Sequence, residues 1–490
     1  MKNNDVRNLL LSLYDHKLAR KIGLKEMDKL LYNTIVKRSD PDIKVIHERQ
    51  YYWATTLIKR LFMNIDKGYI SKNVYERLLL DVFIKGAFHV DIDKKVGKHL
   101  GNIDEYRSGY VNKLDAYKEK YGLYPPSFLV ISPTQQCNLR CTNCYSSSDS
   151  KTTPHLSYEV VDKIVQEFSD EMGGRFIVIS GGEPLMYKEG DKTILDLFEK
   201  YKNIFFMFYS NSTLITDEVA ERLAKMGNAV PAISVEGLEA ETDERRGKGV
   251  YNRILAAMEK LRKVGVPFII SVTATSKNTD ILLTDEFYKT YFDKLGASFM
   301  WQFQLMPIGR GKSAFADMPN ANKRIELFHK WEKLTESKKY PVADFWNSGL
   351  LTSGCIAYGR RGGYLYIDWN GNIMPCVFVP YYTDNINNLY AEGKNLSDAL
   401  KSKLMANGRQ WQIDNQLNDV KKKNNLLMPC SIRDHYKNFR ENIITPETKG
   451  EDEPSQEVLK DKEYYETLVD YDDKLTTLSK PIWDKEYHRK

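Results

Sequence analysis

Apolar residues in the first part of the chain repeat with the spacing of an α-helix, and strand-like alternation is nearly absent there. One such stripe consists of Tyr51, Ala54, Leu57, Ile58, Leu61 and Phe62. Residues three and four apart lie on the same face of a helix, so this spacing predicts amphipathic helices packed on a common core. We therefore expect residues 1–123 to form an α-helical N-terminal domain.

A different pattern begins after Pro125-Pro126, since two adjacent prolines cannot continue a helix. Short apolar segments typical of strands then alternate with helical segments. The expected strands are 128–132, 176–180, 204–209, 229–235, 268–274 and 299–305. Six β–α repeats predict an α/β fold with a parallel sheet and right-handed crossovers. We place this core at residues 124–312.

Three cysteines follow the first expected strand, with the spacing C-x3-C-x2-C at Cys137, Cys141 and Cys144. Three thiolates so close in sequence can converge on one soft metal centre, whereas a closed structural site normally uses four ligands. One coordination position is then left for a small molecule with its own donor atoms. A zinc knuckle or a redox thiol pair is the alternative, but zinc pairs are usually C-x2-C and their sites are closed.

This cysteine loop resembles that of the radical S-adenosylmethionine (radical SAM) enzymes. The resemblance implies a partial (β/α)6 TIM-like barrel and a 4Fe–4S cluster whose unique iron chelates the amino and carboxylate groups of S-adenosylmethionine. In the family an aromatic residue commonly precedes the third cysteine. Here Asn143 stands at that position and Tyr145 follows the cysteine, so Tyr145 is a candidate for contact with the cofactor.

The next two strand ends carry motifs that support the resemblance. Gly181-Gly182-Glu183-Pro184 resembles the family's GGEP motif, which holds the amino group of the bound methionine moiety. The third strand ends at Ser210-Asn211, where the family often presents groups to the ribose hydroxyls. A plain turn in which Thr216 caps the following helix is an equally good interpretation of that segment.

Further polar residues lie at the fourth and sixth strand ends. Ser234 and Glu236 stand where relatives have Ser and Asp, and in relatives an arginine of the following loop pairs with the carboxylate of S-adenosylmethionine. Arg245 and Arg246 are both candidates for that role, and an ion pair with Asp243 is the alternative for either. Arg310, in a Pro-x-Gly-Arg turn, is expected near the cofactor or substrate.

A second set of cysteines lies at Cys355, Cys376 and Cys430, in residues 313–445. Asn370-Gly371 predicts a two-residue hairpin turn before Cys376. The spacing C-x15-G-x4-C resembles the SPASM and Twitch auxiliary domains, and three cysteines fit the one-cluster, Twitch-like form. Asp434 or His435 completes this auxiliary 4Fe–4S site, or an iron stays open to substrate. Buried cysteines without metal are the alternative.

Composition supports a soluble protein of several domains. The chain has 490 residues and a net charge of +6, and it contains neither a long apolar run nor a signal-peptide core. Two groups of three cysteines do not suit a disulfide framework, so we expect a reducing, cytoplasmic location. Residues 1–60 hold 13 Lys or Arg against 7 Asp or Glu, whereas residues 446–490, an acidic tail, hold 8 against 13.

The resemblance implies an enzyme that cleaves S-adenosylmethionine reductively to a 5′-deoxyadenosyl radical, which abstracts hydrogen from an unactivated C–H bond. Such an enzyme is an oxidoreductase or a C–C or C–S bond-forming transferase. It needs an electron donor, namely a reductase, flavodoxin or ferredoxin. We expect no nucleic acid partner.

The substrate is less well defined by the sequence. We first expect a membrane lipid chain, because the N-terminal region is basic and helical, with peripheral membrane contact through that region. A peptide or protein maturase of the SPASM type is the alternative. A non-catalytic iron–sulfur electron carrier is a third hypothesis.

Overall fold

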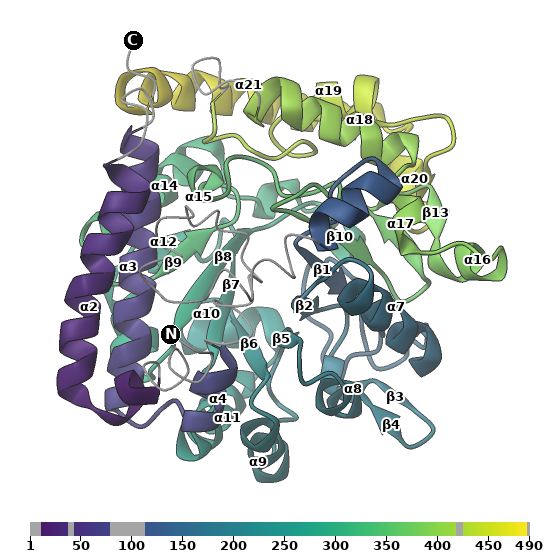
Figure 1. Ribbon diagram of the computed structural model, residues 1–490. Helices are drawn as coiled ribbons and strands as arrows, with labels where there is room; N and C mark the ends of the chain where they lie inside the picture. The colour runs from purple at the N-terminus through teal and green to yellow at the C-terminus, as the bar shows by residue number, and fades with distance from the viewer. Residues whose placement is uncertain (1–10, 38–43, 79–112, 418–424, 488–490) are drawn as a thin grey trace.

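The computed structural model describes residues 11–37, 44–78, 113–417 and 425–487 (Figure 1). Six parallel strands form the centre of the fold in chain order: β1 (Phe128–Ile131), β2 (Phe176–Ile179), β5 (Phe205–Ser210), β6 (Ala229–Val235), β7 (Ile269–Ala274) and β8 (Phe299–Gln304). Each matches an expected strand. The prediction of a partial α/β barrel is therefore confirmed.

The sheet extends beyond both ends of this six-stranded core. Strand β9 (Val342–Asp344) pairs with β8 in parallel. At the other edge, β10 (Tyr364–Ile367) pairs in parallel with β1, and β11 (Asn372–Met374) and β13 (Asp384–Asn385) continue from it in antiparallel register. The expected hairpin at Asn370-Gly371 is present, and Gly371 has a φ of 85°. The hairpin before Cys376 thus belongs to the same ten-stranded sheet as the barrel.

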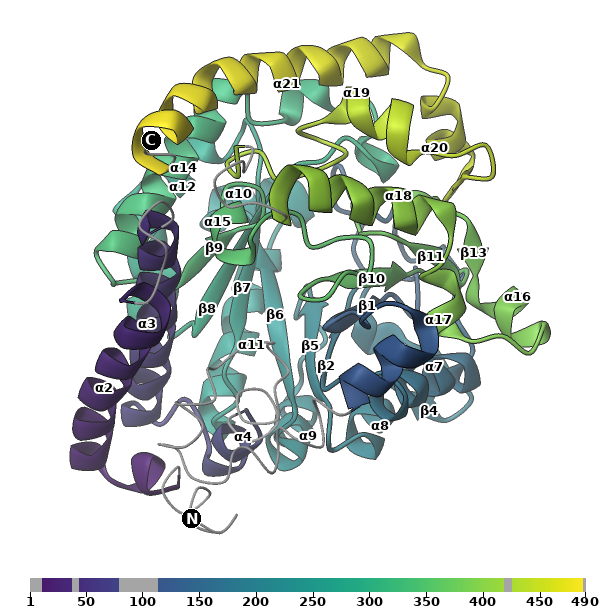
Figure 2. The ribbon, with the colours of Figure 1, turned by 45° about the horizontal axis from the view of Figure 1, so that its top comes forward.

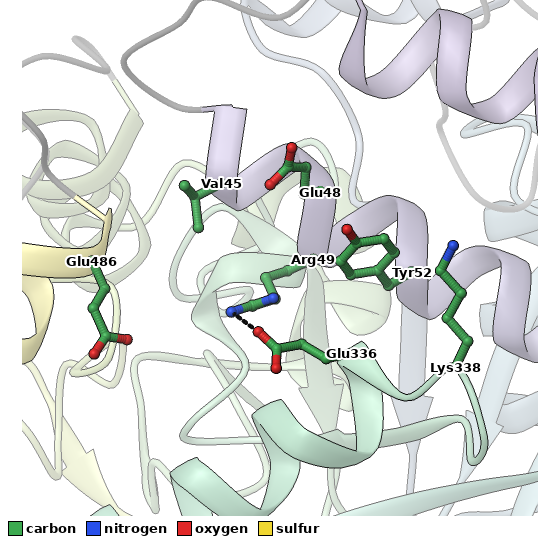
Figure 3. A pocket seen from close by; sticks show the side chains of 7 residues that line it. All are labelled: Val45, Glu48, Arg49, Tyr52, Glu336, Lys338 and Glu486. Carbon is green, nitrogen blue, oxygen red and sulfur yellow. Dashed lines mark ion pairs between the residues drawn. The ribbon is translucent and has the colours of Figure 1, made fainter.

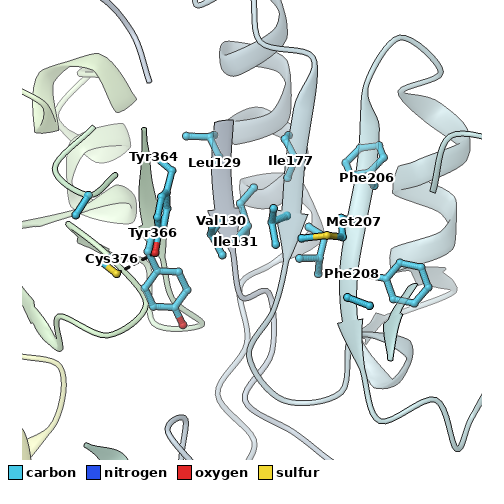
Figure 4. Packing of buried hydrophobic residues seen from close by; sticks show 14 of the residues in the cluster. Leu129, Val130, Ile131, Ile177, Phe206, Met207, Phe208, Tyr364, Tyr366 and Cys376 are labelled. Carbon is cyan, nitrogen blue, oxygen red and sulfur yellow. Dashed lines mark hydrogen bonds between the residues drawn. The ribbon is translucent and has the colours of Figure 1, made fainter. Parts of the chain in front are cut away.

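Helices cover the outer face of the barrel. They are α7 (Tyr158–Asp170), α8 (Ile194–Lys200), α9 (Asp217–Met226), α10 (Glu239–Arg246), α11 (Val250–Val264), α12 (Thr279–Leu282), α13 (Asp285–Tyr288) and η5 (Lys289–Lys294). Local capping defines their ends: Ser157 accepts a hydrogen bond from Val160 N at the start of α7. Leu129, Ile177 and Phe206 are completely buried between sheet and helices (Figure 4).

Five short segments belong to the loops of the barrel. Their bounds are β3 (Lys188–Glu189), β4 (Lys192–Thr193), η4 (Pro184–Met186), η6 (Gly309–Gly311) and η7 (Phe315–Asp317). The 3-10 segment η4 begins five residues after the last residue of β2, and η6 begins five residues after the last residue of β8. They carry residues of the GGEP and Pro-x-Gly-Arg motifs.

The described part of the N-terminal region is helical. It consists of α2 (Lys17–Leu31), η1 (Tyr32–Val36), α3 (Lys44–Asp66), α4 (Lys72–Arg77) and a helical segment at 113–121. Helix α3 lies along the β9 edge of the sheet, where Trp53 Nε1 donates to Val342 O over 3.1 Å and Asn64 Nδ2 donates to Gly296 O over 2.8 Å. Residues 1–10, 38–43 and 79–112 of the expected domain lie outside the described residues.

The remaining chain packs on the barrel as short strands and helices. The bounds are α14 (Ala321–Glu336), α15 (Gly349–Thr352), β12 (Tyr381–Tyr382), α16 (Ile386–Ala391), α17 (Leu396–Ala399), α18 (Lys403–Gln412), η8 (Ile413–Leu417), α19 (Tyr436–Asn438), η10 (Phe439–Ile443), β14 (Lys449–Gly450), α20 (Glu453–Val458), α21 (Lys462–Ile482) and η11 (Trp483–Tyr487). The acidic segment 446–490 is therefore largely helical where it is described. Figure 2 shows α21 crossing one end of the barrel.

One hydrophobic cluster reaches from Ile46 to Tyr487. Because the core is continuous, the boundaries expected near residues 123, 312 and 445 stay predictions. In the described ranges, no helix has the length and apolar character needed to cross a bilayer.

Candidate active site

The loop after β1 brings Cys137, Cys141 and Cys144 together as free, partly exposed thiols. Burial, together with the charges of Glu183 and of the other two thiols, raises the pKa of Cys137 to about 12, so all three thiols lie close enough for their charges to interact. Leu139 N and Asn211 Nδ2 lie 3.4 and 3.7 Å from the Cys137 sulfur. Such donors suit an anionic thiolate bound to iron.

No group of three or more His, Cys, Asp or Glu side chains in the described ranges is arranged to hold a single metal ion. The thiols nevertheless offer what an iron–sulfur cluster requires. They are three soft, partly exposed donors on one short loop, close enough for their charges to interact. The donor set therefore fits a cluster that spans several ångströms.

Arg310 supports the cysteine loop through its backbone. Its guanidinium donates to Cys141 O over 2.7 Å and to Ser148 O over 2.6 Å, and its own N–H donates to Cys144 O over 3.0 Å. Gly309 allows this approach, because a Cβ there would lie 2.0 Å from Tyr145 O. The structure thus places Arg310 against the loop that carries the cysteines.

The GGEP segment packs directly on the start of the same loop. Gly182 N donates to Thr134 O over 2.9 Å and Glu183 N donates to Gln136 O over 2.8 Å. A Cβ at Gly182 would lie 2.1 Å from Gln136 O, so only glycine fits at this contact. Pro184 begins the 3-10 segment η4 and turns the chain away.

The carboxylate of Glu183 is buried and joins two strand ends. It accepts hydrogen bonds from Ser210 Oγ over 2.9 Å, Asn211 N over 2.8 Å and Leu185 N over 3.2 Å. Burial raises its pKa to about 7. Glu183 therefore fixes the end of β5 next to the end of β2.

Asn211 reaches from the end of β5 to the cysteine loop, where its Nδ2 donates to Asn138 Oδ1 over 2.8 Å. Asn138 was not among the predicted site residues, although a polar residue between two cysteines was a visible signal. Thr216 accepts from Val219 N and caps α9. The capping interpretation of this turn is confirmed, and the turn also places Asn211 beside Cys137.

Glu236 binds both candidate arginines. Its buried carboxylate lies 2.6 Å from Arg245 Nη1 and 2.9 Å from Arg246 Nε. Asp243 instead accepts from the backbone of Gly249 and Tyr251. The alternative of an Asp243 ion pair with either arginine is therefore wrong.

The two arginines differ in where their charges act. Arg245 donates to Thr142 O over 3.1 Å and to Asn143 O over 3.4 Å, so it holds the backbone of the cysteine loop. Both arginines lower the pKa of Cys141 against the effect of burial, Arg246 more strongly than Arg245. Arg246 also lowers the pKa of Glu183, which burial raises. The charge of Arg246 therefore acts on both the cysteine loop and the GGEP segment.

The two remaining predicted residues, Tyr145 and Ser234, have different neighbours. Tyr145 shares a 2.7 Å hydrogen bond with Ser180 Oγ, and its ring centroid is 6.2 Å from that of Phe378, near the second cysteine set. Ser234 is partly exposed on β6 and lies in register with Ser271 of β7. Tyr145 therefore connects the first cysteine loop to the second region.

The second set of cysteines also converges. Charges on Cys355 and Cys376 raise the pKa of Cys430 further above the level set by burial, so the three thiols are neighbours. Tyr364, on β10, shares a 2.9 Å contact between its hydroxyl and the Cys376 sulfur (Figure 4). The sequence did not single out this tyrosine. Three neighbouring thiols fit an auxiliary cluster as the first three do.

The two candidates for a fourth ligand differ in whether their side-chain atoms already have partners. Asp434 uses its carboxylate to pair with Arg324 and to accept from Cys430 N over 3.0 Å. His435 Nε2 lies 2.9 Å from Met428 O, which can only accept, so Nδ1 carries the free lone pair. Asp434 is therefore occupied, whereas His435 keeps one nitrogen able to bind a metal.

A polar pocket of about 480 Å³ lies elsewhere, between α3, the end of α14 and the C-terminal segment (Figure 3). Its lining consists of Val45, Glu48, Arg49, Tyr52, Glu336, Lys338 and Glu486. Arg49 and Glu336 form an ion pair of 2.6 Å across it. None of the predicted site residues lines this pocket.

Residues 131–280 match the family model described as "Radical SAM superfamily". A relative, the AdoMet-dependent heme synthase of Methanosarcina barkeri, is 30% identical over 295 residues, which cover 53% of this chain and 79% of the relative. The chain belongs to the radical SAM superfamily. The predicted family is thus confirmed. With it, the 4Fe–4S cluster and S-adenosylmethionine are confirmed as the cofactors of this radical SAM enzyme.

Other radical SAM relatives act in maturation. The mycofactocin maturase MftC of Mycobacterium tuberculosis is 31% identical over 285 residues, covering 56% of this chain and 69% of the relative. Among solved structures, Streptococcus suis SuiB bound to S-adenosylmethionine has a TM-score of 0.51 at 19% identity, covering 84% of this chain and 93% of SuiB. The structural likeness shows a shared fold.

Proposed function

We propose that this radical SAM enzyme is a peptide or protein maturase. The observation that carries the proposal is the match to MftC, a maturase, over more than two thirds of that protein's length. The sporulation killing factor maturation protein SkfB of Bacillus subtilis also matches, at 28% identity over 158 residues. The lipid chain that we expected first has no such support.

In this proposal Cys137, Cys141 and Cys144 hold the cluster that binds S-adenosylmethionine. When bound, the cluster and S-adenosylmethionine supply a 5′-deoxyadenosyl radical. The chain's residues bind and orient the reactants and keep water away. The backbone at Gly181 and Gly182, next to the buried Glu183, would receive the ammonium group of S-adenosylmethionine.

Arg246 is our choice for the carboxylate of S-adenosylmethionine. Its charge acts on both Cys141 and Glu183, whereas the charge of Arg245 acts on Cys141 and its guanidinium donates to the loop backbone. Glu236 holds both guanidinium groups in place. Ser210, Asn211 and Ser234 would offer hydrogen-bonding groups to the ribose, and Arg310 and Tyr145 would position the cysteine loop.

Cys355, Cys376 and Cys430 hold the auxiliary cluster in the same proposal. Because Asp434 is bound to Arg324, the fourth position belongs either to His435 Nδ1 or to the substrate. A flavodoxin or ferredoxin delivers the electrons. These assignments rest on the convergence of the thiols and on the free nitrogen of His435.

A second candidate is a tetrapyrrole-modifying enzyme, favoured by the 30% identity to the heme synthase of M. barkeri. The experiment compares peptide, porphyrin and lipid extracts from cells that carry the wild-type enzyme or Cys137→Ala. We expect a mass change in a peptide that depends on Cys137. A Cys137-dependent change confined to porphyrins or lipids contradicts the maturase proposal.

A further inference from the structure

Helix α2 lies at the outer edge of the molecule, beside α3, in both views of the fold (Figure 1, Figure 2). Contacts with α3 fix which side of α2 faces inward. Arg20 is buried and pairs with Asp66 of α3. Tyr51 of α3 donates its hydroxyl to Asp28 over 2.9 Å, and Met27 packs on the apolar cluster that α3 shares with α4. The opposite side of α2 is therefore turned away from the protein.

Four lysines form one ridge on this outward side. Because residues four apart lie on the same side of a helix, the ridge follows the helix axis over about 18 Å. It consists of Lys17, Lys21, Lys25 and Lys29, all of them exposed. Lys29 pairs with Glu26 over 3.0 Å. The other three lysines have no ion-pair partner in the described ranges, so the ridge carries an excess of positive charge.

Two apolar side chains stand beside the lysine ridge. Leu18 is 70% exposed and Ile22 is 57% exposed, which makes them the most exposed large apolar side chains in the described ranges. They lie four residues apart, hence on one side of the helix, and each has a lysine three residues further along, Lys21 and Lys25. A single exposed leucine is ordinary, but this pair adds an apolar strip to a basic surface.

The combination of lysines and apolar side chains fits the surface of an anionic bilayer. Phosphate groups there attract lysines, while the boundary of the acyl chains accepts leucine and isoleucine. Lysine stems are long enough to keep their ammonium groups at the phosphates while the helix lies lower. The surface of an acidic protein would satisfy the charges but would leave the two apolar side chains in water. The bilayer is therefore the better match.

We propose that α2 binds peripherally to an anionic lipid bilayer, with the lysine ridge on the phosphate groups and with Leu18 and Ile22 at the acyl boundary. This assigns residues to the membrane contact that the basic N-terminal sequence predicts. The inference does not rest on the proposed function, since it holds for a peptide, a porphyrin or a lipid as substrate.

The test measures co-sedimentation of the reconstituted full-length protein with lipid vesicles, under anaerobic conditions. One vesicle type contains phosphatidylcholine alone, and the other also contains phosphatidylglycerol. We expect binding to the anionic vesicles that weakens with rising salt, because salt screens exposed charges. Lys21→Gln/Lys25→Gln should weaken it about thirtyfold, since one lysine near an anionic surface contributes about fivefold. Lys462→Gln/Lys474→Gln, with the same charge change at exposed positions of α21, should bind like the wild type.

A second variant, Leu18→Gln/Ile22→Gln, tests the apolar strip and keeps every charge. It should bind the anionic vesicles about tenfold more weakly or worse, because two apolar side chains no longer leave water. Glutamine is a good helix former. Melting temperatures should match the wild type for all variants, because every substituted side chain is exposed.

Several results overturn the proposal. They are equal binding to both vesicle types, an absence of binding to either, and unchanged binding in Lys21→Gln/Lys25→Gln or in Leu18→Gln/Ile22→Gln. An equal loss in the α21 control would show that only net charge matters. If vesicles do not bind while flavodoxin reduces the lysine variant more slowly than the wild type, the ridge is a docking surface for an acidic protein instead.

Discussion

Arg324 and Asp434 form an ion pair in the interior of the protein, where both side chains are completely buried. Arg324 Nη2 lies 3.0 Å from Asp434 Oδ2, which also accepts from Cys430 N. The pair therefore joins α14 to the loop of the last cysteine. It also removes Asp434 from the possible ligands of that site.

Arg324→Met should destabilise the protein strongly, because it leaves the carboxylate of Asp434 buried without its cation. We expect a loss of about 3–5 kcal/mol in the free energy of unfolding, measured by chemical denaturation. The double variant Arg324→Met/Asp434→Leu removes both charges and should recover much of that loss. If Arg324→Met has the same free energy of unfolding as the wild type, the buried ion pair does not stabilise the fold as described.

Cys137→Ala, Cys141→Ala or Cys144→Ala should abolish the formation of 5′-deoxyadenosine from S-adenosylmethionine and lower the iron content. The reason is that each variant removes one of only three thiolates on that loop. Cys430→Ala is the matched comparison: it should also lower the iron content but retain cleavage of S-adenosylmethionine. Chromatography of the products and iron analysis check both statements. Continued cleavage in Cys137→Ala would disprove the site assignment.

Arg246→Ala should weaken the binding of S-adenosylmethionine by about tenfold or more, because a charge-assisted hydrogen bond to its carboxylate is lost. Arg245→Ala should instead lower the iron content, since Arg245 holds the backbone at Thr142 and Asn143. Equilibrium dialysis and iron analysis of both variants measure the two effects. If Arg245→Ala instead weakened the binding of S-adenosylmethionine and Arg246→Ala lowered the iron content, Arg245 would be the cofactor ligand.

Asp472 predicts a pH dependence of stability. It is buried on α21, where burial raises its pKa to about 9, and only its Oδ2 accepts a hydrogen bond, from Tyr436 N over 2.7 Å. Its carboxyl ionises near pH 4 in the unfolded chain and only near pH 9 in the folded protein, so ionisation of the unfolded chain lowers stability as pH rises between these values.

Asp472→Asn removes this effect. We expect the stability difference between Asp472→Asn and the wild type to grow in favour of the variant between pH 5 and pH 8, by up to about 1.4 kcal/mol per pH unit. Denaturation at several pH values measures it. Asp473→Asn, exposed on the same helix, is the control and should show no such trend. If the free energy of unfolding changed with pH in the same way for Asp472→Asn and the wild type, Asp472 would not be a buried, protonated carboxyl in the folded protein.

Periodic and motif signals in the sequence predicted most of the barrel. The strand at 176–180 and the cap at Thr216 are local patterns, and the structure has both. The pairing of β10 with β1 was not predictable, because four apolar residues do not specify which edge they join. Long-range partners such as Arg324 and Asp434, 110 residues apart, leave no local signal either.

The distinction between Arg245 and Arg246 was likewise beyond the sequence. Adjacent residues of a helix point in directions about 100° apart. Which of the two faces the thiols depends on how α10 is rotated against the barrel. Only the contacts of Arg245 with the loop backbone decide this.

The parallel ladder between β1 and β10 ties together the strand that leads into the first cysteine loop and the strand that precedes Cys376. Neither cysteine set can swing away from the other without breaking this ladder. Electron tunnelling between metal centres at the two sites would therefore cross a gap set by backbone geometry, and a hinge motion would not adjust its rate.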